Sequence, residues 1–274
     1  MKAIVIPEPG RVEVKELPMV QRREGEAVLK LLYGGVCGSD LGTYRGMNVY
    51  AQYPCVIGHE FAAQVVWAGE NDYGIREGMI VTCNPYFNCG SGYSCRRGLV
   101  NCCTHNETMG VQREGAFAEY ISMPYERIYD GQGLEPRILS LIEPFCISSH
   151  AVNRADVREG DRVLVMGSGT IGLLAAVAAS LRGGEVYISD ISEEKLTFAE
   201  KMGIRHTILN RSKEALLDAA SQATDGDYFD VCIEATGVPE AFVDCIDAAA
   251  FQGRIVDCLL YTSPSPRDQG EYRM

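Results

Sequence analysis

The feature that most constrains the fold is a short apolar run followed directly by closely spaced glycines. After its first residue Arg162–Met166 is wholly apolar, and Gly167-Ser168-Gly169-Thr170-Ile171-Gly172 comes next. Such a run is typical of a strand covered on both faces, as in a parallel sheet. Residues 170–181 are dense in Ala, Leu, Ile and Val, which predicts a buried helix. This order of strand, glycines and helix predicts a βαβ unit.

The same alternation continues through residues 148–258. Strands are predicted at 185–189, 206–209, 229–234 and 253–257, with helices at 193–202, 212–223 and 238–250 between them. Strands that alternate with helices of this length form parallel sheets with right-handed crossovers. The sequence therefore predicts an α/β domain with a doubly wound parallel sheet over 148–258.

The glycines of this turn predict a dinucleotide site. Gly167 allows the tight turn, Gly169 lets amides approach a pyrophosphate, and Gly172 lets the helix pack closely on the strand. Asp190 ends the next strand, where a carboxylate accepts hydrogen bonds from ribose hydroxyls and repels a 2′-phosphate. We therefore predict NAD rather than NADP. The alternative is a glycine turn that binds nothing.

Residues 1–147 differ in composition and are rich in Gly, Pro, Tyr and Cys. Short apolar runs separated by Gly and Pro predict the strands of a barrel or sandwich, at 2–6, 11–15, 27–32, 61–67, 79–82 and 116–121.

Charge and cysteine content limit the possible partners. A net charge of -12 argues against nucleic-acid and anionic-membrane partners. No apolar run is long enough to span a bilayer and the N-terminus lacks a secretory signal, so we expect a cytoplasmic protein. In such a chain, clustered cysteines among a total of 11 are more typical of metal ligands than of disulfides.

Three residues of the first half predict a metal site. Cys37, His59 and Glu60 offer a thiolate, an imidazole and a carboxylate, which suit Zn²⁺. The alternatives are a core cysteine and a histidine whose hydrogen bonds the protein satisfies.

These motifs resemble the zinc-containing medium-chain alcohol and polyol dehydrogenases. The matching pieces are 35–40, 58–60, the cysteine-rich lobe at 89–103, Glu143-Pro144 and 167–172. The chain is most similar to the sorbitol and threonine dehydrogenase branch, and residues 84–87 with 110–113 resemble L-gulonate or L-galactonate 5-dehydrogenases. The resemblance covers residues 1 to about 257. It implies a GroES-like β-barrel catalytic domain over 1–147 and a Rossmann domain over 148–258.

The resemblance also implies residue roles at the catalytic zinc. Cys37 and His59 would be ligands, and Glu60 a ligand or an exchangeable neighbour. Glu143 would bind the metal directly or through its water. Asp40 would accept a hydrogen bond from the second ring nitrogen of His59.

Other residues would carry the proton and contact the cofactor. Ser39 would relay the substrate proton. Many relatives have a histidine three residues later, where this chain has Gly42, so water or Tyr44 would complete the path. Thr236 and Gly237 would approach the cofactor.

A second zinc is implied by the spacing C-x2-C-x2-C-x7-C, which falls on positions 89, 92, 95 and 103. Cys89, Cys95 and Cys103 are present, but position 92 is glycine. Cys102, His105 or water could be the fourth ligand. The alternative is a loop of free thiols, and the net charge argues against a nucleic-acid zinc ribbon.

We therefore predict a dehydrogenase that transfers hydride from a secondary alcohol of a polyol or sugar acid to NAD. Full-length relatives would be homo-oligomers. The Pro/Ser-rich residues 259–274 predict a disordered or foreign tail and an incomplete Rossmann domain. The alternatives are a non-catalytic fragment that binds NAD and zinc, and a zinc-free quinone-reductase relative.

Overall fold

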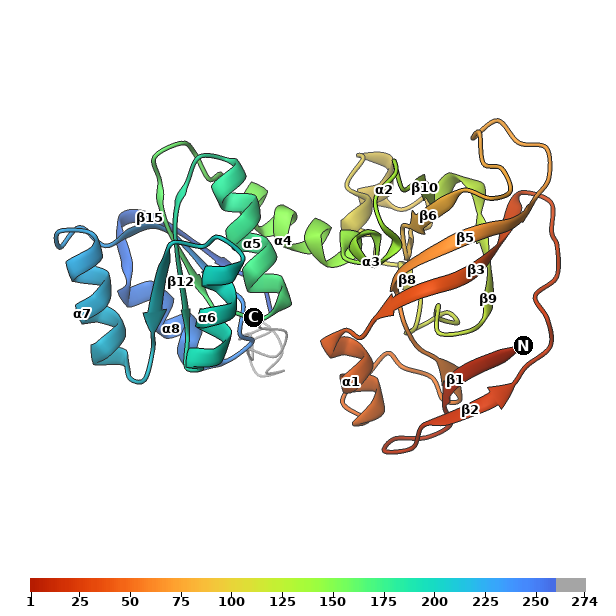
Figure 1. Cartoon of the computed structure of the whole chain (residues 1–274), viewed down its shortest axis with the longest axis horizontal. Coiled ribbons are helices and arrows are strands. Elements are labelled where there is room, and N and C mark those ends of the chain that lie inside the picture. Colours follow the sequence, from red (N-terminus) through yellow and green to blue (C-terminus); the bar gives the residue numbers. More distant parts are fainter. Residues whose placement is uncertain (260–274) are drawn as a thin grey trace, which may run out of the picture. The chain divides into compact units, whose positions relative to one another are not determined.

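The structure, a computed structural model, describes residues 1–259 (Figure 1). The tail predicted at 259–274 lies outside the described residues, except for Leu259. The prediction that the Rossmann domain is incomplete also concerns residues outside the described ones. The chain divides into two compact units, Met1–Glu143 and a second that begins at Pro144. The domain boundary expected after residue 147 falls within helix α4 (Ile142–Arg154).

The first unit is built from antiparallel sheets. A five-stranded sheet has the order β10-β6-β5-β3-β9, a three-stranded sheet the order β2-β1-β4, and β7 pairs with β8. The strands are β1 (Lys2–Ile6), β2 (Glu13–Glu16), β3 (Glu26–Gly35), β4 (Cys55–Val56), β5 (Glu60–Ala68), β6 (Ile80–Cys83), β7 (Tyr86–Phe87), β8 (Glu107–Thr108), β9 (Tyr120–Pro124) and β10 (Ile128–Asp130). The short helices are α1 (Gly38–Tyr44), α2 (Tyr93–Arg96) and α3 (Pro136–Leu139), with 3-10 turns η1 (Val100–Cys102) and η2 (Tyr125–Arg127).

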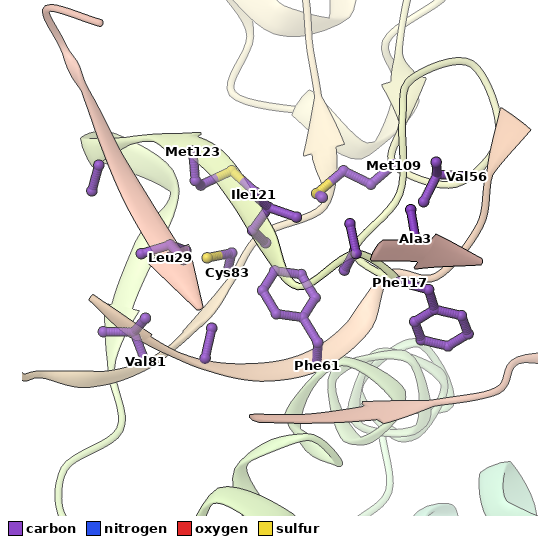
Figure 2. Packing of buried hydrophobic residues seen from close by; sticks show 14 of the residues in the cluster. Ala3, Leu29, Val56, Phe61, Val81, Cys83, Met109, Phe117, Ile121 and Met123 are labelled. Atoms are coloured by element: carbon purple, nitrogen blue, oxygen red, sulfur yellow. The ribbon is translucent and has the colours of Figure 1, made fainter. Parts of the chain in front are cut away.

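One core fills this unit between its sheets. Phe61 of β5 is 1% exposed. Figure 2 shows it among buried side chains from several strands, including Leu29, Val81, Cys83, Ile121 and Met123. Burial alternates along β9, which places Ile121 and Met123 on its inward face, whereas β5 and β6 have runs of consecutive buried residues.

The segment predicted as a strand from residue 116 differs from the prediction. The strand begins only at Tyr120, and the residues before it bond to several other segments. Gly115, Ala116 and Phe117 donate N–H bonds to the carbonyls of 56, 58 and 57 in turn, at 2.8, 2.8 and 3.0 Å. Glu119 donates to the Lys2 carbonyl at 2.9 Å. The segment therefore links β1 to the loop that follows β4, which a single-strand pattern does not reveal.

The second unit holds one parallel sheet in the order β13-β12-β11-β14-β15. Counted along the unit this is 3-2-1-4-5, the order of a doubly wound dinucleotide-binding fold. The strands are β11 (Arg162–Met166), β12 (Glu185–Asp190), β13 (His206–Leu209), β14 (Phe229–Glu234) and β15 (Ala249–Asp257). The helices are α5 (Thr170–Leu181), α6 (Glu193–Lys201), α7 (Lys213–Ala223) and α8 (Pro239–Asp247). The predicted fold class is confirmed.

Helices cover both faces of this sheet. Val163 and Val165 of β11 pack with α5 and α6, whereas Leu164 and Met166 pack with α7 and α8. This alternation explains why β11 reads as an unbroken apolar run. Among residues 1–259, no helix is both long enough and apolar enough to cross a membrane.

The helix predicted at 238–250 is longer than the helix in the structure. Helix α8 ends at Asp247 rather than at residue 250, and β15 begins at Ala249. Ala249 pairs with Phe229 of β14, followed by a register shift. The alanines favour a helix by intrinsic propensity, but pairing with β14 outweighs that preference.

Truncation of the first core should destabilise the first unit specifically. Leu29 is fully buried, so Leu29→Ala should lower the free energy of unfolding by about 2–5 kcal/mol. The only tryptophan, Trp67, lies in β5, so its fluorescence during urea denaturation reports on this unit. The control Val14→Ala, at a residue 69% exposed, should have little effect. Equal effects of the two substitutions would contradict the assigned core.

Candidate functional site

A buried carboxylate organises the loops of the candidate metal site. Asp40, in the first turn of α1, is 2% exposed. Its Oδ2 accepts the N–H of Cys37 at 2.9 Å, and its Oδ1 accepts the N–H of Gly58 at 3.1 Å. Asp40 therefore fixes both the residue immediately before α1 and the turn that immediately precedes His59.

These loops bring the predicted ligands together. One ligand atom each from Cys37, His59 and Glu60 lies within 4.8 Å of the others. Cys37 is half-buried, and the other two side chains are buried. A Cβ at Gly35 would lie 2.4 Å from Glu60 Oε2, so glycine there leaves room for the carboxylate. Thiolate, imidazole and carboxylate donors at this spacing form a set that suits zinc.

The hydrogen bond expected between His59 and Asp40 is not formed. His59 Nδ1 lies 3.9 Å from Asp40 Oδ1, and within the described chain this buried nitrogen has no hydrogen-bond partner. Both oxygens of Asp40 already accept backbone N–H groups. The unsatisfied Nδ1 lies on the Asp40 side of the ring, and the ring also contacts Cys37. The donor types and their spacing, rather than this nitrogen, therefore indicate a metal site.

Glu143 borders the group without joining the closest three residues. It lies in the first turn of α4, is 7% exposed, and accepts a hydrogen bond from the Tyr86 hydroxyl at 2.6 Å. Sequence reasoning missed Tyr86 as a site residue. Its only signal was its place in the 84–87 segment, because it approaches Glu143 only through the fold.

The electrostatics of the group depend on these acids. Burial lowers the pKa of His59, but Cys37, Asp40 and Glu143 outweigh burial and raise this pKa to about 9. Burial and the charge of Glu143 raise the pKa of Glu60. A metal ion that binds here must therefore displace a proton from His59 at neutral pH.

The predicted proton-relay residues lie on α1. Ser39 is exposed in its first turn, two residues after Cys37, and Tyr44 is exposed at its last residue. A Cβ at Gly42 would meet nothing within 4 Å, so position 42 faces open space. These placements allow a relay through Ser39, but no hydrogen bond links the two hydroxyls.

The cysteine-rich lobe contains a second group of close donors. Sulfur atoms of Cys89, Cys95 and Cys103 lie within 4.8 Å of one another. Neither Cys102 nor His105 joins them in the described structure. N–H groups of the Gly92 and Ser91 backbone lower the pKa of Cys89 to about 6. The lobe thus supplies three of the four ligands expected of a closed structural zinc.

The glycine turn has the geometry of a phosphate-binding loop. Gly167 has φ +100°, a left-handed conformation that favours glycine. A Cβ at Gly172 would lie 1.8 Å from the Gly167 carbonyl oxygen, so only glycine lets α5 start this close to β11. Gly169 precedes α5, and no atom lies within 4 Å of where its Cβ would be. The backbone at this helix start is therefore accessible to a pyrophosphate.

A hollow of about 600 Å³ opens beside this turn. Gly167, Gly169, Asp190 and Thr236 line it. Asp190 accepts the N–H groups of Ser168 and Ser192 at 2.8 and 2.9 Å, and a carboxylate retains further acceptor capacity for ribose hydroxyls. The other predicted cofactor residues, Thr170, Ile171, Gly172 and Gly237, do not line the hollow.

Glu234 is a further residue that sequence reasoning missed. It ends β14 and is fully buried. Its Oε1 accepts the N–H of Thr236 at 2.6 Å, the N–H of Gly237 at 2.9 Å and the Thr236 hydroxyl. Glu234 therefore shapes the loop that borders the hollow. An acid that closes an apolar strand just before Thr-Gly was the available signal.

Family comparisons match both units. The alcohol dehydrogenase GroES-like domain family matches residues 23–132, and the zinc-binding dehydrogenase family matches residues 170–264. The chain is 31% identical to L-galactonate-5-dehydrogenase of Escherichia coli, over 93% of this chain and 75% of the relative. It is 33% identical to sorbitol dehydrogenase of Halalkalibacterium halodurans, over 96% and 78%.

Solved structures agree with this result. A zinc-binding dehydrogenase of Sinorhizobium meliloti bound to NADP superimposes with a TM-score of 0.87 at 27% identity, covering 97% of this chain and 80% of that one. The alcohol dehydrogenase RspB of E. coli in complex with NADH gives 0.85 at 31% identity, covering 94% and 75%. The expected GroES-like and Rossmann folds are thus confirmed.

Zinc affinity at the Cys37 group should depend strongly on pH. The raised pKa of His59 means that its proton is held up to about pH 9, so each pH unit below about 9 should weaken zinc binding roughly tenfold. Competition with a chromophoric chelator from about pH 6 to about pH 9 measures this. The measurement is made in a Cys95→Ser background, because this substitution removes one donor of the group formed by Cys89, Cys95 and Cys103. An affinity that stays flat over this range would contradict the assigned environment of His59.

Proposed function

The chain belongs to the zinc-binding alcohol dehydrogenase family, and from that premise we propose that it oxidises a secondary alcohol of a polyol or sugar acid with NAD. The observation that carries this proposal is the close group of Cys37, His59 and Glu60, in which one ligand atom of each residue lies within 4.8 Å of the others. The relatives named for L-galactonate and sorbitol support this small-molecule substrate class.

Cys37, His59 and Glu60 would hold the catalytic zinc, with Glu143 beside them. Bound zinc supplies Lewis acidity, which lowers the pKa of an alcohol substrate. Tyr86 donates to Oε1 of Glu143 and so restrains this carboxylate. Asp40 holds the Cys37 and Gly58 backbone in place, which fixes the spacing of the ligands.

The substrate proton would leave through α1. The Ser39 hydroxyl can accept a proton from the substrate and pass it to water, because the side chain is exposed. With glycine at position 42, no imidazole follows Ser39 along this path. Water, or the exposed Tyr44 hydroxyl at the end of the helix, would carry the proton onward.

NAD would accept the hydride and occupy the hollow beside Gly167–Gly172. The amides at the start of α5 would bind its pyrophosphate, and Asp190 its adenosine ribose. Lys195 also lines the hollow, but its ammonium lies 3.5 Å from Asp190 Oδ2. Asp190 thus pairs with one of the three cations of residues 1–259 that line the hollow. The other two, Arg211 and Lys213, pair with Glu193 and Asp247.

Activity should depend on the Cys37 group. We expect NADH formation with one or more members of a panel of polyols and sugar acids. Cys37→Ser should lower kcat/KM by more than the roughly 10- to 100-fold that follows loss of a group supporting a metal ligand. The control Cys102→Ser removes an exposed thiol outside both groups. Stoichiometric binding of zinc and NAD with no turnover on any substrate would contradict the proposed reaction and favour a binding fragment.

Cofactor preference should follow the charge at Asp190. Asp190→Ala removes the repulsion of a 2′-phosphate and frees Lys195, so the ratio of kcat/KM for NAD to that for NADP should fall about 10- to 100-fold. Steady-state kinetics with both cofactors measure this ratio. The control Glu194→Gln neutralises a nearby exposed acid of α6 that does not line the hollow. A larger shift in the control than in Asp190→Ala would assign the preference elsewhere.

A further inference from the structure

The cysteine-rich lobe offers three sulfur atoms in one place. Cys89 Sγ lies 3.5 Å from Cys103 Sγ and 3.9 Å from Cys95 Sγ. Cys95 belongs to the short helix α2, whereas the other two lie on either side of it in loops. Three thiolates at this separation can bind one soft or borderline cation together.

Backbone donors point at these sulfurs. The N–H groups of Gly92 and Cys89 donate to Cys89 Sγ and Cys103 Sγ respectively, both at 3.3 Å. The N–H of His105 donates to Cys103 Sγ at 3.4 Å. Hydrogen bonds to sulfur stabilise the thiolate form, which is the form that binds metal. The loop is therefore arranged around negatively charged sulfur atoms, and this evidence is independent of their proximity.

The fourth corner of the group lies at Gly92. An ideal Cβ on Gly92 would sit 3.4 Å from Cys89 Sγ, which is an ordinary contact distance. Gly92 has φ -67° and ψ 166°, an extended conformation that any residue can adopt. A side chain at this position would therefore reach the sulfurs without backbone strain, and glycine leaves that corner without a donor.

No other residue of the described lobe fills this corner. Cys102 is exposed and outside the close group, although it is adjacent to Cys103. His105 Nδ1 lies 3.1 Å from the Thr104 hydroxyl, and His105 is also outside the group. The three donors therefore do not fit a closed structural zinc, which takes four protein ligands. Cys89 is exposed, so solvent reaches the group.

We propose that Cys89, Cys95 and Cys103 form an open three-thiolate metal site, in which a solvent-derived ligand takes the corner beside Gly92. Zinc held in this way exchanges its fourth ligand and leaves the protein faster than zinc enclosed by four thiolates. A small external thiol can occupy the same corner. The proposal does not depend on the proposed reaction, because the donors differ from those of the Cys37 group.

Cobalt and zinc serve as probes in the test. The metal-free, reduced full chain is titrated with Co²⁺ in a Cys37→Ser background, so that the lobe is the remaining close group of donors. We expect one Co²⁺ per chain with a thiolate-to-cobalt absorption band, and loss of that band in Cys95→Ser. Addition of 2-mercaptoethanol should change the spectrum. No cobalt binding, or a spectrum unchanged by the thiol, would overturn the proposal.

Gly92→Cys provides the decisive comparison. Transfer of zinc from the lobe to a chromophoric chelator should be slower in Gly92→Cys than in the parent protein, by roughly tenfold or more. The cobalt spectrum of Gly92→Cys should no longer respond to the external thiol. The matched control Cys102→Ser should release zinc at the rate of the parent protein. Equal rates for the parent and Gly92→Cys, or loss of the metal in Cys102→Ser, would overturn the proposal. If Gly92→Cys does not fold, the parent and Cys95→Ser titrations decide the question alone.

Discussion

The carboxylate of Asp40 is the constraint on which the proposed metal site of the first unit depends. It is buried, and each oxygen accepts one backbone N–H, from Cys37 and from Gly58. A buried charge is tolerated only when hydrogen bonds compensate it, and these two bonds also fix two loops that are distant in sequence. The positions of a thiol and an imidazole therefore follow from the capping of one short helix.

This arrangement concentrates acidic groups around a single imidazole. Asp40, Glu60 and Glu143 surround His59 together with the thiol of Cys37. Like charges at low exposure destabilise a fold unless a positive charge compensates them. In the metal-free protein the proton on His59 supplies part of that compensation. The same charge distribution would favour a divalent cation, so the electrostatic strain of the site and its proposed function have one origin.

Local patterns predicted much of the fold, and the limits of the prediction are physical. Strands β11, β13 and β14 and helix α5 matched their predicted bounds. For β11, β14 and α5 the reason is that mostly buried strands and an alanine-rich helix leave strong local signals. The start of β15 was missed because pairing with β14 overrides local propensity. Ligand types at 37, 59 and 60 could be read from the sequence. The role of Tyr86 could not, since its contact with Glu143 forms only in the folded chain, whereas Glu234 contacts residues two and three positions away and left a local signal.

The hydrogen bonds between residues 115–117 and 56–58 have a consequence for the effect of mutations. The turn before His59 is held by carbonyl groups that accept N–H bonds from a segment far along the chain. A Cβ at Gly115 would lie 2.2 Å from the Ile57 carbonyl oxygen, so even alanine there must displace this turn. A substitution at a residue that is not itself a ligand would thus weaken metal binding at the proposed site. Screens for metal-deficient alleles should therefore recover changes at Gly115 as well as at the ligands themselves.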